Sequence, residues 1–157
     1  MRENHEFHHK SITGYFLTAR LGITELNERT LRNQYVCFLE FAVARKDYNI
    51  CIYLNSMDQK EACTARIAEQ KGSAASCEQI KNPYWFDYCF QGVAVMTGTT
   101  APCGKIKNAQ SSAENPFTLH GCISAVAKQN NDPNICYQIS ETQDLYYCLE
   151  GVNQPQE

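Results

Sequence analysis

Several features that would assign a function directly are missing from this 157-residue chain. It contains no G-x-S-x-G, no H-E-x-x-H and no phosphate-binding glycine loop, the motifs of common hydrolases, zinc proteases and nucleotide-binding proteins. It also lacks a run of about 18 apolar residues, the minimum for a transmembrane helix. We therefore predict no catalytic residues, no cofactor, no metal and no membrane span.

Positive charge is neither abundant nor clustered. The chain has 14 lysine and arginine residues against 17 aspartate and glutamate residues, a formal net charge of −3. Proteins that bind nucleic acid usually carry a basic patch or stripe. The charge pattern therefore predicts no nucleic-acid partner.

Cysteine, by contrast, is abundant, with nine residues. No two of them form a C-x-x-C pair, the spacing of most zinc and redox sites, so disulfides are favoured over metal. Disulfides persist in oxidising compartments, which predicts a periplasmic or extracellular protein. The N-terminal residues "MRENHEFHHKSITGYFLTARLG" contain no apolar signal segment. We therefore expect a mature form from which a signal peptide has been removed.

The cysteines follow a regular spacing. From Cys37 to Cys103 the number of residues between successive cysteines alternates between 13 and 11; it is then 18 up to Cys122, followed again by 13 and 11. One insertion of seven residues in a 26-residue period describes the whole set. A fixed period of this kind indicates a repeat array.

Apolar residues keep the same period. The fourth residue after the first cysteine of each unit is Phe41, Ile67, Val93, Val126 or Val152, and alanine follows in the first four units. The third residue after the second cysteine is Leu54, Ile80, Ile106 or Ile139. Spacings of three and four residues are typical of a buried helix stripe. Each unit is predicted to be a long helix with a central cysteine, followed by a short helix that begins close to the second cysteine.

The predicted fold is an all-α, right-handed stack of disulfide-stapled helical hairpins, an α-solenoid-like repeat with a period of about 26 residues. Residues 1–10 are predicted to be a mobile N-terminus, with His5, His8 and His9 not binding metal. A single domain covers residues 11–153, with a capping helix at 11–32 and repeats from 33. Residues 154–157 form a C-terminal tail.

Two disulfide pairings fit the spacing. Antiparallel helices bring cysteines separated by 11 residues to nearly equal height around Met57, Pro83 and Thr142, within the roughly 7 Å between Cα atoms that a disulfide requires. This favours the pairs Cys51–Cys63, Cys77–Cys89, Cys103–Cys122 and Cys136–Cys148. The alternative joins cysteines separated by 13 residues, beginning with Cys37 and Cys51. In the favoured pairing Cys37 is a free thiol, predicted to be buried.

Two segments are candidates for binding a protein partner. Insertions in repeat proteins are often found on the binding face, and residues 107–117, "KNAQSSAENPF", contain the insertion. The second segment is "YWFDYCF", whose aromatic side chains are too many for one buried stripe. The predicted binding residues are Tyr84, Trp85, Phe86, Tyr88, Ser111, Ser112, Glu114 and Asn115.

The repeated cysteine, valine or isoleucine, and alanine positions of residues 37–153 resemble those of the cysteine-stapled helical-repeat proteins that bacteria secrete. The resemblance implies the same helical architecture. We expect a periplasmic or secreted protein-binding module, most concretely an inhibitor or immunity protein that binds a toxin or hydrolase. The alternative is an enzyme or small-ligand carrier with a site between hairpins. The oligomeric state is not predicted.

Overall fold

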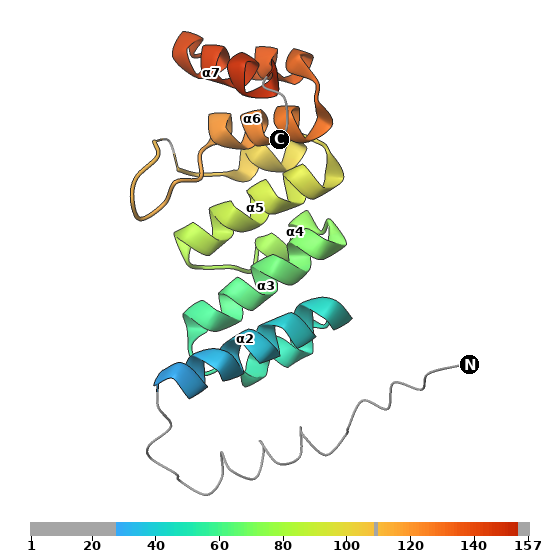
Figure 1. Cartoon of the computed structure of the whole chain (residues 1–157), viewed down its shortest axis with the longest axis vertical. Helices are drawn as coiled ribbons and strands as arrows, with labels where there is room; N and C mark the ends of the chain where they lie inside the picture. Colours follow the sequence, from blue (N-terminus) through green and yellow to red (C-terminus); the bar gives the residue numbers. More distant parts are fainter. Residues whose placement is uncertain (1–27, 109, 154–157) are drawn as a thin grey trace, which may run out of the picture. The chain divides into compact units, whose positions relative to one another are not determined.

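The structure, a computed structural model, describes residues 28–108 and 110–153, with side chains from Tyr35 onward (Figure 1). All regular secondary structure among the described residues is helical, and no strand is found there. The chain divides into two compact units, residues 1–34 and 35–157. The predicted mobile N-terminus, residues 11–27 of the predicted capping helix and the C-terminal tail lie outside the described residues.

Long and short helices alternate along the described chain. From α3 onward each long helix packs against the next one, α3 against α5, α5 against α6 and α6 against α7. The predicted start of the repeats at residue 33 lies inside α2. The right-handed solenoid remains a prediction. The elements are α2 (Glu28–Arg45), η1 (Tyr48–Tyr53), α3 (Met57–Lys71), α4 (Ala74–Cys77), α5 (Pro83–Thr97), η2 (Ala101–Lys105), α6 (Leu119–Asn130), η3 (Pro133–Gln138) and α7 (Thr142–Asn153).

Each disulfide joins a short helix to the long helix that follows it, as the favoured pairing predicted. The four Cα–Cα distances lie between 5.6 and 5.7 Å, within the normal range for a disulfide. The insertion lies inside the longest disulfide loop, in which the two cysteines are 19 positions apart. The bonds are Cys51–Cys63, Cys77–Cys89, Cys103–Cys122 and Cys136–Cys148.

Four long helices end in the same way. The ninth residue after the central cysteine has a positive φ and so reverses the chain. The next residue donates its backbone N–H to the carbonyl of the repeated alanine, which gives the bonds Asp47–Ala42, Ser73–Ala68, Thr99–Ala94 and Asp132–Ala127. The same turn therefore follows each helix. The residues with positive φ are Lys46, Gly72, Gly98 and Asn131.

The short helices differ in part from the prediction. They begin close to the second cysteine, as predicted, two or three residues before it, but three of the four are 3₁₀ helices. In every unit the third residue after this cysteine donates its backbone N–H to the cysteine carbonyl. The repeated apolar residues therefore mark the end of a single tight turn and not a helix stripe. Three of them are nonetheless buried: Leu54, Ile80 and Ile139.

The repeated apolar positions face different neighbours. Ile67, Val93 and Val126 are buried against the preceding unit, and the alanine after each packs toward the following unit. Phe41 was predicted to belong to this stripe, but its side chain is 39% exposed. No described element precedes α2 to cover it, and the ring instead contacts the Arg45 guanidinium, 4.9 Å from its centroid.

Cys37 is a free thiol, but it is exposed and the prediction of burial was wrong. The other long-helix cysteines are covered by the sulfur of a preceding short helix, and the described part of the chain has no short helix before α2. An exposed side chain is open to reagents in the native state.

We expect the native protein to react with one equivalent of Ellman's reagent, and the reduced, denatured protein with nine, one for each cysteine. Cys37→Ser should remove the native reaction and leave the eight disulfide-bonded cysteines unchanged. More than one reactive thiol in the native wild-type protein would contradict the disulfide pairing.

Candidate functional site

The two segments predicted to bind a partner meet at the start of α5. The Asn82 side chain caps this helix by accepting the N–H groups of Tyr84 and Trp85. The ring centroid of Phe117, at the end of the insertion, lies 5.2 Å from that of Tyr84 and 5.5 Å from that of Tyr88. Trp85 contacts both tyrosines edge-on, at 4.8 and 5.6 Å. We call Tyr84, Trp85, Tyr88 and Phe117 the aromatic cluster.

All four side chains of the aromatic cluster are half-buried. Phe86, also predicted to bind, lies apart from them. Its ring packs against Phe90 at 4.8 Å and beneath the Lys107 ammonium at 4.5 Å. Phe86 is therefore part of the packing of α5, whereas Phe117 belongs to the cluster and was not among the predicted binding residues.

A buried carboxylate anchors the insertion at both ends. The side chain of Asp87 is 1% exposed. Its Oδ1 accepts the backbone N–H of Lys107 at 3.1 Å, and its Oδ2 accepts Nδ2 of Asn115 at 2.8 Å. Hydrogen bonds to a charged acceptor are stronger than those between neutral groups. The insertion is thus tied to the helix that carries the aromatic cluster.

Further hydrogen bonds order the insertion internally. Asn108 Nδ2 donates to the carbonyls of Asn115 and Phe117, at 2.7 and 3.1 Å. Ser112 and Asn115 bond twice, through Ser112 N–H to the Asn115 carbonyl and through Asn115 N–H to the Ser112 hydroxyl. Ser111, Ser112 and Glu114 are exposed. The insertion therefore presents a fixed polar turn beside the aromatic cluster, and we call residues 111–115 with that cluster the insertion surface.

The anchoring residue occupies a repeat position that sequence analysis did not single out. Asp87 lies two residues before Cys89, and Glu61 lies two residues before Cys63. Glu61 is also buried, and it accepts the backbone N–H groups of Lys81 and Asn82, each at 2.9 Å. Both acids hold the turn that leads into the following long helix. The sequence does contain a signal that could have identified these anchors, namely an acidic residue two positions before the long-helix cysteine in two successive units.

His120 lies two residues before Cys122, the position that Glu61 and Asp87 occupy in their helices, and it joins α6 to α7. Its Nδ1 lies 2.6 Å from Oδ2 of Asp144. A histidine paired with a carboxylate is also the geometry of a catalytic base. Among the described residues, however, no nucleophilic side chain is hydrogen-bonded to His120. Because His120 occupies the position of the anchoring acids in the two preceding units, we interpret its contact with Asp144 as a link between α6 and α7.

Two polar contacts fix the aromatic cluster on α3. Trp85 Nε1 donates to Oδ1 of Asp58 at 2.6 Å, and the Tyr88 hydroxyl donates to Oε2 of Glu69 at 3.1 Å. Burial, together with the negative charge of Glu69, raises the pKa of Tyr88 to about 12. The neutral phenol is therefore the form that the fold favours.

This pKa predicts a loss of stability at high pH. Because the pKa of Tyr88 is raised above its ordinary value of 10.0, its stabilising contribution is present below pH 10 and is lost as the pH rises toward 12. We expect the phenolate absorption of wild type minus Tyr88→Phe to titrate near 12, and Glu69→Gln to lower that midpoint. A midpoint near 10 in the wild-type protein would contradict the burial of the Tyr88 hydroxyl, and an unchanged midpoint in Glu69→Gln would contradict its contact with Glu69.

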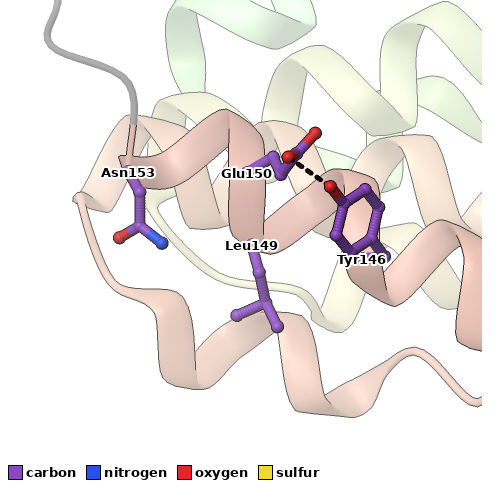
Figure 2. A pocket seen from close by; sticks show the side chains of 4 residues that line it. All are labelled: Tyr146, Leu149, Glu150 and Asn153. Carbon is purple, nitrogen blue, oxygen red and sulfur yellow. Dashed lines mark hydrogen bonds between the residues drawn. The ribbon is translucent and has the colours of Figure 1, made fainter.

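A depression on α7 is lined by Tyr146, Leu149, Glu150 and Asn153, with a volume of about 490 Å³ (Figure 2). Tyr146 donates to the Glu150 carboxylate across it. Asn153 takes the position of the alanine that packs toward the following unit in earlier helices. The Tyr146 hydroxyl and the Glu150 carboxylate bond to each other, so we assign no ligand to this depression.

No group of three His, Cys, Asp or Glu side chains in the described residues is placed to hold a metal ion. The helices of residues 28–153, as far as they are described, include none that is long and apolar enough to cross a bilayer. Comparison with family models, curated proteins and solved structures finds no match to this chain.

Proposed function

We propose that this chain is a protein-binding module and that its partner binds the insertion surface. The observation that carries this proposal is the double anchoring of the insertion by Asp87. A loop held in one conformation loses little conformational entropy on binding, so more of the contact energy appears as affinity. The surface also has the composition of an interface centre, with half-buried Tyr and Trp beside exposed serines.

Four disulfides are typical of a protein from an oxidising compartment. Within such compartments we propose the periplasm or the extracellular medium. The most concrete form of the proposal is an inhibitor or immunity protein, whose partner is a secreted toxin or hydrolase. A rigid polar turn beside half-buried aromatic side chains suits such a role, because an interface centre of this composition is typical of protein–protein contacts.

Site-specific photocrosslinking tests the proposed surface. A benzophenone amino acid at Ser112 should capture a protein from the secreted or periplasmic fraction of the source organism. The same group at Lys128, an exposed residue of α6, should not capture it. The purified partner should then bind wild-type protein with a Kd that rises at least about tenfold in Glu114→Lys, because an interfacial charge is reversed. Equal capture from both positions, or an unchanged Kd, would contradict the proposal.

A further inference from the structure

A groove lies over α3, away from the insertion surface. One wall is formed by η1 and the other by α4 and the turn that follows it. Its volume is about 360 Å³. The lining residues are Tyr48, Asn49, Cys51, Ile52, Lys60, Thr64, Ser76 and Gln79.

The groove coincides with a break in the repeat. In α5, α6 and α7, the residue three positions before the cysteine and the residue one position after it are both apolar. In α3 the same two positions are Lys60 and Thr64, so polar side chains replace an apolar pair where the groove is found. Departures from a consistent local pattern are expected at functional sites. The apolar pairs are Phe86 with Phe90, Leu119 with Ile123, and Leu145 with Leu149.

The groove carries positive charge. Lys60 is half-buried, and its ammonium forms no ion pair within the described part of the chain. Lys71 lies over the ring of Tyr48, 4.5 Å from its centroid, and adds a second cation beside the wall. A cation without a counter-charge among the described residues favours binding of an anion, and a carboxylate is the anion that proteins offer most often.

The rim of the groove can recognise a peptide backbone. Asn49 and Gln79 are exposed on opposite walls, and neither side-chain amide is hydrogen-bonded to another described residue. A side-chain amide can both donate to and accept from a peptide group. The exposed rim leaves room for a chain to enter and leave, unlike the closed pockets that bury most of a small ligand.

We propose that this groove binds an extended acidic segment of a partner protein, with a carboxylate on Lys60 and the backbone between Asn49 and Gln79. The groove shares no residue with the insertion surface. The two proposals therefore stand or fail separately.

Selection from peptide pools tests the proposal. The oxidised full-length protein is mixed in solution with two pools of randomised octapeptides. One pool contains Asp and Glu, and the other contains Asn and Gln in their place. Peptides that remain bound to the protein are called retained and are identified by mass spectrometry. Acidic peptides should be retained selectively. Their affinity should fall at least about tenfold in Lys60→Leu, the loss expected for a charge-assisted hydrogen bond. Lys60→Leu restores the apolar residue of the other units, so it should fold.

Lys128→Leu, a change at an exposed lysine of α6, should leave the affinity unchanged. In NMR spectra a retained peptide should shift the amide signals of Thr64, Ser76 and Gln79 and leave those of Ser111 and Glu114 in place. The proposal is overturned by equal binding to Lys60→Leu, by retention of no acidic peptide, or by acetate displacing the peptides at the concentration at which free acetate itself binds. The last result would reduce the groove to a simple carboxylate site.

Discussion

Reduction of the four disulfides is expected to unfold residues 35–153 at room temperature. Each disulfide closes a loop of 12 or 19 positions, and in the chain-entropy model such a loop stabilises the folded state by about 3 kcal/mol. Four bonds together contribute about 12 kcal/mol, comparable with the whole stability of an ordinary domain. The helical circular dichroism should therefore disappear when a phosphine reductant is added, and return on reoxidation.

The short helices explain why the loss should be complete. They contain only four to six residues each, too few to persist without a covalent link to the next long helix. The matched control is alkylation of Cys37 alone, which should leave the spectrum unchanged because no disulfide involves it. Full helicity in the presence of reductant would show that packing alone sustains the fold.

The second large effect is expected from Asp87→Ala. The substitution removes the acceptor of two hydrogen bonds in a buried site and leaves the Lys107 N–H and the Asn115 amide without their partner. Hydrogen bonds to charged groups contribute about 1.5–3 kcal/mol each, so we expect the free energy of unfolding to fall by about 3 kcal/mol. Denaturant titration measures this change, and hydrogen exchange should show faster opening of residues 107–117.

Two further variants separate anchoring from general destabilisation. Asp87→Asn keeps an oxygen for the Lys107 N–H but turns an amide donor toward the Asn115 donor, so it loses one of the two hydrogen bonds and its effect should be smaller, about 2 kcal/mol. Glu114→Ala, an exposed change in the same insertion, should alter stability by less than about 0.5 kcal/mol. If Asp87→Ala behaves like Glu114→Ala, the insertion is not held by this carboxylate.

The repeat and the disulfide pairing could be predicted because both depend on local spacing. Residues three, four and seven apart share a helix face whatever surrounds them, and an 11-residue separation places two cysteines symmetrically about a tight turn. The prediction was less successful for the short helices. An apolar residue three positions after a cysteine fits both an α-helix and a single 3₁₀ turn, so the spacing of Leu54 or Ile139 does not distinguish them.

Contacts between residues far apart in the chain were decided by the tertiary structure alone. Asp87 and Asn115 are 28 positions apart, and only the packing of the insertion on α5 brings them together. The exposure of Cys37 follows from which described elements surround α2, and the groove at Lys60 from the walls that η1 and α4 provide. The sequence by itself therefore determined the period, the long helices and the covalent links, because these depend on neighbouring residues. The insertion surface and the groove required the folded chain, because each depends on side chains that only packing between units brings together.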